Sequence, residues 1–567
     1  MKSRLSWMYR DYATDDEAKM EERKLMSALE GDAPFSDPDF PANGRSLYLN
    51  EFQPPPYAIP ASLVEWNRIS RKEIAGCYEP RTFSSSSSGV VQGALGNRWL
   101  IGALGVVSRR EHLRAQLVVS SACAGRGLYT VKFYKCGKWR YVHVDDRIPC
   151  TRSGTPHYGR SVDPDEVWVM VVEKAYAKLH GCYEAIAVGT LEDGLRDLTG
   201  LAVETTSLPS WDEIRDATAR RVLLAVCDTS KPLEPLDPAG AFNKPSGLLK
   251  NHPYLVAEAI DATADATASY DALDCRMIRL ENPWLIGGWT GDWSPGSDLW
   301  KTYEPIAKAC LPPGDGRISF WIEFRDLSKR FDEMVKTYQL PNKIVRQGAW
   351  VPGDDKSGAG GSPAYSQTWK RNPQYCFDVL QSSTVACASI SQLDARWHEA
   401  HSRAHRPLPL GFVVQSVPGG RRATRFRPTA SRVLTPLFLP QRTITRAFAL
   451  EPGSYVLVPS TYEPAHVATP FVLEIHSDKP ITFHDIPEVV AEDDDAPSKI
   501  DDPDGDDERD GGSVCAVGSP TPNVHEPPAR DLHALWEQAA RLATFLASLS
   551  DANAAIEEKL NTILPSK

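Results

Sequence analysis

The sequence predicts an α+β protein built from several domains. With 567 residues, the chain is long enough for two to four domains that each bury a core. Residues 100–107 form an apolar run that is typical of a buried helix. Residues 127–134 and 139–144 alternate apolar and polar side chains, which is typical of paired strands. Helix and strand signals therefore occur close together in the same part of the chain.

The composition is that of a soluble globular protein, with 42% hydrophobic and 24% charged residues. No stretch approaches 18 consecutive apolar residues, so no transmembrane helix is expected. The first residues lack the apolar run of a secretory signal. The eleven cysteines are scattered singly without a Cys-x-x-Cys pair, which predicts neither a zinc site nor a disulfide framework. We expect a reducing, cytoplasmic location.

The net charge of −11 is concentrated near the C-terminal end. Between Glu492 and Asp510, eleven acidic residues face only Lys499 and Arg509, which leaves about −2 for the rest of the chain. Such a run is typical of a disordered linker. It does not form an EF-hand loop, because its proline and glycine break the required ligand register. We therefore predict an acidic disordered linker over residues 486–528.

Three separated stretches carry the candidate chemistry. Residues 92–99 read Gln-Gly-Ala-Leu-Gly-Asn-Arg-Trp, His252 precedes Pro-Tyr, and Asn282 precedes Pro-Trp. Together they resemble the active-site signatures of the calpain family of papain-like cysteine peptidases. In that family the first stretch reads Gln-Gly-x-x-Gly-Asp-Cys-Trp. The resemblance implies that Gln92 supplies an oxyanion-hole donor and that His252 and Asn282 are the other two members of the triad.

Two positions depart from the family pattern. Arg98 stands where the nucleophilic cysteine should be, and Asn97 replaces the usual Asp. A cysteine peptidase needs a thiolate and a neighbouring histidine that holds it deprotonated. A guanidinium stays protonated, has no lone pair to offer, and disfavours an imidazolium beside it. We therefore expect an inactive protease core; a nucleophile elsewhere in the chain is the alternative.

The vestigial groove could still hold an extended peptide. Its expected lining is Gln92, Trp99, His252, Asn282 and Trp284. Because Arg98 is cationic, we expect this groove to favour an acidic peptide.

The resemblance covers residues 35 to about 480 and implies a two-part papain-like core followed by a C2-like antiparallel β-sandwich. The expected domains are an N-terminal arm (1–34), the first half of the core (35–204), the second half (205–330), the sandwich (335–485), the acidic linker (486–528) and an amphipathic or coiled-coil helix (529–564).

Calpain cores bind calcium, but this chain lacks several of the expected acidic ligands. The serine run 84–88 contains no carboxylate, and the residues after Trp284 are mostly apolar or glycine. Calcium prefers six to eight oxygen ligands, with carboxylates contributing much of the affinity. Glu184 alone does not make a site. We expect the core calcium sites to be lost or weak, and we predict no metal ligands.

The sandwich contains an arginine-rich stretch. Residues 396–446 hold ten arginines and a single acid, Glu399. This pattern fits a solvated face, or a surface for anionic lipid, for an acidic cytoskeletal protein or for the chain's own segment 492–510. The candidate basic patch is Arg421, Arg422, Arg425 and Arg427.

The last segment has heptad spacing. From Leu532, the a positions are apolar except for Asn553, and every d position is apolar over more than four heptads. A single a-position Asn is typical of a coiled coil with a fixed register. We predict association through this helix with a second copy or a partner; a single helix docked on the body is the alternative. The predicted contact residues are Leu535, Leu542, Leu546, Leu549, Asn553, Ile556 and Leu560.

The function expected from the resemblance is that of a binding or scaffolding protein. Calpain-like proteins without EF-hands, often with altered triads, abound in kinetoplastid protozoa, and several such families associate with the cytoskeleton. We therefore expect protein partners, a cytoskeletal and even flagellar association, and no nucleic-acid partner. The alternatives are a calcium-dependent cysteine endopeptidase and a module that binds anionic membranes through the sandwich.

Overall fold

The computed structural model describes residues 12–484, apart from 57, 85–88, 209, 221, 230–241, 244–245, 265–272, 311–315, 355–357, 395, 397–406, 418, 420 and 436–437. The predicted acidic linker and the predicted C-terminal helix, with its contact residues from Leu535 to Leu560, lie outside these residues. The serine run lies outside them from residue 85 to residue 88. None of the described helices is both long and apolar enough to cross a lipid bilayer.

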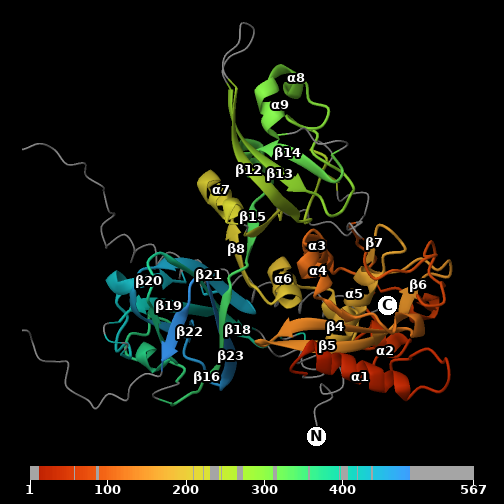
Figure 1. The fold of residues 1–567 in the computed structure, drawn as a ribbon. Coiled ribbons are helices and arrows are strands. Elements are labelled where there is room, and N and C mark those ends of the chain that lie inside the picture. Colours follow the sequence, from red (N-terminus) through yellow and green to blue (C-terminus); the bar gives the residue numbers. More distant parts are fainter. Residues whose placement is uncertain are drawn as a thin grey trace, which may run out of the picture. The chain divides into compact units, whose positions relative to one another are not determined.

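The first half of the core is built around two buried helices and a three-stranded antiparallel sheet (Figure 1). Small sheets pair β1 with β6 and β2 with β7, and the larger sheet has the order β3-β4-β5. Its elements are α1 (Asp15–Ser27), α2 (Gly44–Leu47), η2 (Ala61–Leu63), β1 (Glu65–Arg68), β2 (Val90–Val91), α3 (Arg98–Ser108), α4 (Glu111–Ala115), β3 (Val118–Ser120), η3 (Ala124–Arg126), β4 (Leu128–Lys135), β5 (Lys138–Asp145), β6 (Arg147–Cys150), β7 (Arg160–Ser161), α5 (Trp168–His180), η4 (Glu184–Ile186) and α6 (Leu191–Thr199).

These elements confirm the helix and strand signals of the sequence. The apolar run forms α3, whose residues from Trp99 to Ser108 are all buried. The two alternating segments form β4 and β5, which pair antiparallel with Leu128 opposite Asp145. The N-terminal arm contributes α1, which begins after the capping Thr14. Asp15 of this helix accepts hydrogen bonds from Lys132 of β4 at 2.8 and 2.9 Å, so α1 packs on the sheet.

The second half of the core is a six-stranded sheet with the order β14-β13-β12-β9-β15-β8. Its last strand, β15, follows the predicted end of the core at residue 330 and lies between β9 and β8. The elements are β8 (Ala202–Ser207), α7 (Trp211–Ala219), β9 (Leu223–Cys227), β10 (Phe242–Asn243), β11 (Leu248–Leu249), β12 (Tyr254–Ala264), β13 (Leu273–Glu281), α8 (Leu299–Thr302), α9 (Glu304–Cys310), β14 (Ser319–Glu323), α10 (Phe324–Arg330) and β15 (Glu333–Tyr338).

The third part is an antiparallel β-sandwich, as predicted. One sheet has the order β16-β23-β18-β21 and the other has the order β20-β19-β22-β17-β24. Side chains from both sheets, among them Ile390, Phe412, Leu457 and Leu473, form one buried apolar cluster. The elements are β16 (Asn342–Trp350), η5 (Trp369–Arg371), β17 (Tyr375–Val379), β18 (Thr384–Gln392), β19 (Leu410–Ser416), η7 (Pro428–Ala430), β20 (Ser431–Leu434), β21 (Thr443–Leu450), β22 (Gly453–Thr461), β23 (Thr469–Ser477) and β24 (Ile481–His484).

A buried set of charges joins the sandwich to the first half of the core. Arg442, which precedes β21, donates to Asp197 of α6 at 2.7 and 3.0 Å. Lys135 at the end of β4 pairs with Asp197 and with Asp394 of the sandwich. Arg396 bridges Asp394 and the α6 residue Asp193, each at 3.0 Å. We call these six residues the interdomain charge cluster. Two arginines of the arginine-rich stretch are therefore buried ion-pair partners and do not lie on a solvated face.

Candidate active site

Arg98 is the first residue of α3, at the position where the resemblance places the nucleophile. The loop before it is held by a 2.8 Å hydrogen bond from the Ala94 backbone N–H to the His157 carbonyl. The Arg98 side chain is half-buried. Burial lowers the pKa of its guanidinium, whereas the electrostatic interaction with the nearby Cys227 side chain raises it. Position 98 therefore presents a cation that can bind anions but cannot attack a carbonyl.

Both polar atoms of the Gln92 amide are hydrogen-bonded to neighbours. Its Nε2 donates to the Leu95 carbonyl at 3.0 Å, and its Oε1 accepts from Nε of Arg98 at 3.0 Å. An oxyanion-hole donor must point at the site where negative charge develops. In this structure one of the two N–H groups of Gln92 Nε2 points instead at a carbonyl of its own loop.

His252 lies just before β12 and is 5% exposed. Its Nδ1 lies 2.6 Å from the Lys250 carbonyl oxygen, so this nitrogen carries the proton. Its ring packs edge-on against Trp284, with 4.4 Å between the ring centroids. Burial, together with the Arg98 charge, lowers the pKa of His252 to about 4, although the hydrogen bond to the Lys250 carbonyl acts in the opposite direction. His252 is therefore neutral at physiological pH.

Asn282 follows β13 and is fully buried. Its Nδ2 donates to the Ile286 carbonyl at 3.1 Å, and its Oδ1 accepts from the Trp284 backbone N–H at 3.1 Å. Both polar atoms of the amide thus brace the loop that follows. Within the described part of the chain, no hydrogen bond joins Asn282 to His252.

Close packing brings these positions together across the two halves of the core. A Cβ on Gly102 of α3 would stand 2.8 Å from Cγ of Pro253, and one on Gly105 would stand 3.0 Å from Cβ of Pro283. Arg109, at the end of α3, donates to the Asn282 carbonyl at 2.8 Å. Helix α3, which begins at Arg98, therefore lies directly against the loops that carry His252 and Asn282.

Trp99 is clamped between the core and the sandwich. Its Nε1 donates to the Ile186 carbonyl at 3.1 Å, and the Arg396 guanidinium carbon lies 4.7 Å from its ring centroid. A cation over an indole face is an attractive contact. The interdomain charge cluster thus reaches the residue that adjoins the nucleophile position.

A buried carboxyl group lies beneath the start of α3. Asn97 donates from Nδ2 to Oε1 of Glu173 at 2.7 Å, and the Gly159 backbone N–H donates to Oε2 at 2.9 Å. Burial raises the pKa of Glu173 to about 7, although both hydrogen bonds act in the opposite direction. Asn97 is neutral, so its contact with Glu173 does not place a second carboxylate beside the Glu173 side chain.

A thiol lies near Arg98. Cys227, the last residue of β9, is buried, and its thiol and the Arg98 guanidinium are close enough to affect each other's pKa. Burial nevertheless raises the pKa of the Cys227 thiol, which disfavours the thiolate that a nucleophile requires. None of the ten cysteines in the described part of the chain is disulfide-bonded.

The other predicted site residues have separate roles. Arg421, Arg425 and Arg427 are exposed, whereas Arg422 donates to the Lys370 and Asn372 carbonyls at 2.9 and 3.0 Å. The Glu184 carboxylate accepts from the Leu49 backbone N–H at 2.8 Å. Among the residues that the structure describes, no group of three or more His, Cys, Asp or Glu side chains could hold a metal ion.

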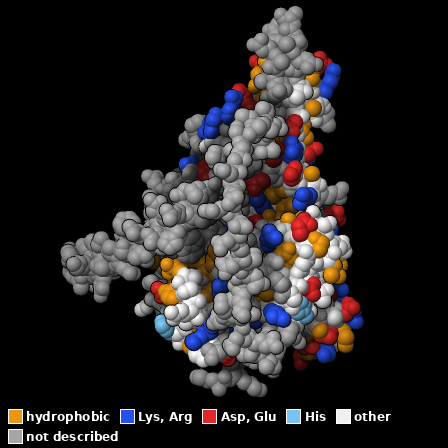
Figure 2. All heavy atoms as spheres, turned by 90° about the vertical axis from the view of Figure 1, so that its left-hand side faces the viewer, with side chains coloured by type: hydrophobic (Ala, Val, Ile, Leu, Met, Phe, Trp, Pro, Cys, Tyr) orange, Lys and Arg blue, Asp and Glu red, His pale blue; other side chains and the backbone are white. Residues whose placement is uncertain are grey.

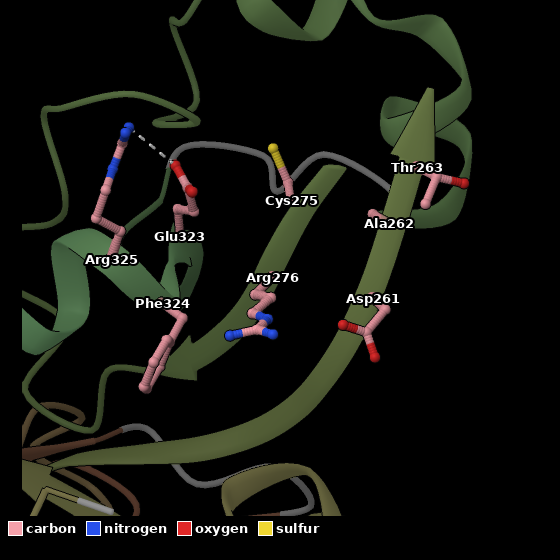
Figure 3. A pocket seen from close by; sticks show the side chains of 8 residues that line it. All are labelled: Asp261, Ala262, Thr263, Cys275, Arg276, Glu323, Phe324 and Arg325. Atoms are coloured by element: carbon pink, nitrogen blue, oxygen red, sulfur yellow. Dashed lines mark hydrogen bonds and ion pairs between the residues drawn. The ribbon is translucent and has the colours of Figure 1, made fainter. Parts of the chain in front are cut away.

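A separate hollow opens on the sheet of the second half of the core. It has a volume of about 420 Å³, and Figure 3 shows charged side chains around it, including the ion pair of Arg325 with Glu323 at 3.4 Å. Strands β12, β13 and β14 supply most of its walls. Its lining contains none of the predicted triad or groove residues, so it is not part of this site.

Sequence reasoning did not identify three features of the site. These are the contact of Arg396 with Trp99, the buried acid Glu173 and the nearby thiol of Cys227. The one available signal was Glu173 itself, an acid within the largely apolar run 167–177. The other two depend on contacts between residues that are far apart in the chain.

The comparisons with known proteins agree with this arrangement. The family model "Calpain family cysteine protease" matches residues 35–337, and "Calpain large subunit, domain III" matches residues 346–476. The chain is 28% identical to the calpain-1 catalytic subunit of Gallus gallus over 503 residues, which cover 82% of this chain and 68% of that protein. It is 29% identical to calpain-5 of Mus musculus over 485 residues, covering 79% and 73%. Because the first model alone matches more than half of its 567 residues, the chain belongs to the calpain family of cysteine proteases.

Proposed function

We propose that this calpain-family protein binds polypeptides in its protease core without cleaving them, and that it serves as a scaffolding component. The observation that carries the proposal is the identity of residue 98. Acyl transfer by this family's chemistry begins with a thiolate at the start of α3, and Arg98 occupies that position. A guanidinium there forms no covalent intermediate.

The rest of the site supports the same conclusion. Gln92 donates to its own loop, His252 is neutral with Nδ1–H directed at a backbone carbonyl, and both polar atoms of Asn282 brace its loop. Catalytic residues that act as a unit lose most of their effect when one of them is missing. The fold of the core is retained, and we propose that it still offers a surface for an extended peptide.

Proteolysis assays test the proposal directly. The purified native chain and an Arg98→Cys variant are incubated with casein and with a peptide library, with and without calcium. We expect the native chain to produce no cleavage above background. If Arg98→Cys cleaves substrate and the Arg98→Cys, His252→Ala double variant does not, the protease core is intact except for the residue at position 98. Turnover by the native chain that disappears in His252→Ala would refute the proposal.

The alternative is a calcium-dependent cysteine endopeptidase that uses another thiol. Cys227 is the specific candidate because its thiol interacts with Arg98. An activity-based thiol probe distinguishes the two: labelling of Cys227 in the native chain, abolished by Cys227→Ser, would favour the alternative. We expect no labelling, because burial keeps this thiol protonated.

Membrane binding by the sandwich has weaker support. Arg421, Arg425 and Arg427 are exposed, but on the face drawn in Figure 2 the described basic and acidic side chains are interspersed. Co-sedimentation with phosphatidylserine vesicles and with neutral vesicles tests this function. Equal sedimentation with both would exclude an electrostatic lipid site.

The scaffolding part of the proposal rests on the heptad pattern from Leu532 to Ile563. We propose that this segment joins the protein to a second copy or to a cytoskeletal partner. Light scattering of the full chain after size-exclusion chromatography measures the oligomer. Leu542→Asp and Leu549→Asp together are expected to reduce a multimer to a monomer, whereas the matched a-position change Asn553→Asp is expected to have a smaller effect.

A further inference from the structure

We infer that the Arg98 guanidinium, at the start of α3, is a carboxylate-binding site that takes an acidic side chain of an extended peptide. This inference rests on the proposed function and specifies its ligand. It requires that Arg98 have free donors and that its surroundings favour an anion.

Arg98 has donors to spare. Nε is committed to Gln92, and among the described residues no acceptor pairs with Nη1 or Nη2. Two other largely buried arginines of the core, by contrast, are matched to carboxylates: Arg114 lies 3.4 Å from Glu166, and Arg68 contacts Asp146 at 2.6 Å. The two Nη groups form the side of a guanidinium that binds a carboxylate through parallel hydrogen bonds.

Gln92 also fixes the orientation of this guanidinium. The bond from Nε to Oε1 of Gln92, together with the bond from Gln92 to the Leu95 carbonyl, restricts the side chain to one arrangement. A donor group that is already ordered loses less entropy when it binds. The hydrogen bond between Gln92 and Arg98 thus orients a cation at the start of α3.

The surroundings favour a negative charge. His252 is neutral, and its Nδ1–H is bonded to the Lys250 carbonyl. It therefore neither repels the Arg98 guanidinium nor competes with it for the carboxylate of a ligand. Helix α3 is eleven residues long, and no side chain caps its N-terminus because Asn97 is turned towards Glu173. The positive end of the helix dipole therefore adds to the Arg98 charge at this point.

Exposed apolar side chains occur on two segments that contact residues of the site. Val188, 81% exposed, follows Ala187, whose carbonyl lies 3.4 Å from the Cβ position of Gly96. Ile286, 51% exposed, belongs to the loop braced by Asn282. A peptide with one acidic residue between apolar residues is therefore the ligand to test.

Fluorescence anisotropy with a pair of matched peptides tests the inference. Both are labelled nonapeptides with blocked ends and apolar residues around the centre; one has a central Glu and the other a central Gln. The blocked ends ensure that the side chain is the only carboxylate. We expect the native full-length chain to bind the Glu peptide about tenfold more tightly than the Gln peptide at low salt.

Variants assign the preference to Arg98. Arg98→Met is expected to bind the two peptides equally, and Arg98→Lys is expected to keep part of the preference. Arg325→Met, which removes an exposed arginine at the hollow of Figure 3, should leave it unchanged. Thermal unfolding verifies that each variant is folded.

The outcomes separate this inference from the proposed function. Equal binding of both peptides by the native chain, or a Glu preference that survives in Arg98→Met, would overturn the carboxylate site and leave peptide binding intact. If neither peptide binds at millimolar concentration, the peptide-binding function and the inference fail together. Competition by free acetate but not by chloride at the same ionic strength would further support recognition of the carboxylate.

Discussion

Asn97 donates a 2.7 Å hydrogen bond from Nδ2 to Oε1 of Glu173, one residue before the start of the helix that carries the nucleophile position. The Oδ1 of the same amide is buried and accepts no hydrogen bond within the described structure. A protonated Glu173 could donate to this oxygen after a flip of the amide, whereas a carboxylate could not. In the observed arrangement Asn97 donates, which favours the carboxylate, so it is burial that stabilises the neutral acid.

Replacing Glu173 should make stability less dependent on pH. The pKa of Glu173 is about 7 in the folded state, against 4.5 for the free side chain. The folded state therefore binds more protons than the unfolded state between these values, and stability falls as pH rises through this range. A shift of this size corresponds to about 3 kcal/mol. Glu173→Gln cannot ionise and should escape this loss.

Urea unfolding at pH 5 and pH 8 measures the effect. The stability of Glu173→Gln relative to the native chain is expected to rise between pH 5 and pH 8. The exposed Glu111→Gln serves as the control for losing an acid at the surface. A Glu173→Gln difference that is the same at both pH values would contradict the raised pKa.

His252 should stay neutral throughout the physiological range. Its pKa of about 4 results from burial first, and the Arg98 charge contributes in the same direction. The Cε1–H resonance of His252 should therefore remain unchanged from pH 8 to pH 5 in selectively labelled protein. Arg98→Met should raise this pKa because a neighbouring cation is removed. An unchanged or lower pKa in Arg98→Met would show that the two side chains do not interact.

Much of the fold could be predicted from local patterns and family motifs. The apolar run after Trp99 placed α3, the alternating segments placed β4 and β5, and the later motifs placed the sandwich. The order of the motif residues 92–99, His252 and Asn282 also indicated which loops meet at α3, and the structure brings those loops against this helix.

The orientation of the site side chains could not be predicted. The amide of Asn282 and the ring of His252 are directed by backbone carbonyls of their own loops, and no spacing in the sequence specifies those bonds. The burial of Arg396 and Arg442 was equally hidden, because an arginine in a charged run is ordinarily exposed. Their acidic partners on α6 are far away in the sequence.

Gly102 should be required for the close approach of α3 to the His252 loop. A methyl group here would stand 2.8 Å from the Pro253 ring, which cannot move aside as a flexible side chain could. Alanine favours the helix by about 1 kcal/mol, but overpacking typically costs about 1–3 kcal/mol. We therefore expect Gly102→Ala to destabilise the protein by up to about 2 kcal/mol.

Gly125 offers the matched control for this substitution. No atom lies within 4 Å of its Cβ position, so Gly125→Ala should leave the urea midpoint nearly unchanged. Equal midpoints for both variants would show that α3 and the His252 loop can separate at little cost.

Arg442 should be essential to the contact between the sandwich and the core. Its guanidinium donates to Asp197 at 2.7 and 3.0 Å, and this aspartate is fully buried with its pKa lowered to about 2. Burial acts to raise that pKa, and Arg442 and Lys135 overcome this effect. Arg442→Met leaves buried carboxylates with too few cations, and breaking such a pair typically costs about 3–5 kcal/mol.

Urea unfolding at pH 7 tests this expectation against a matched arginine. Arg215 also has several acidic partners, Asp212, Asp216 and Asp261, at 3.1, 3.7 and 3.3 Å, but it is exposed to solvent. Because water screens its interactions, Arg215→Met should barely change the unfolding midpoint. Adding Asp197→Asn to Arg442→Met removes one unmatched charge and should restore part of the lost stability. If Arg442→Met proved as harmless as Arg215→Met, the interdomain charge cluster would contribute little to holding the sandwich on the core.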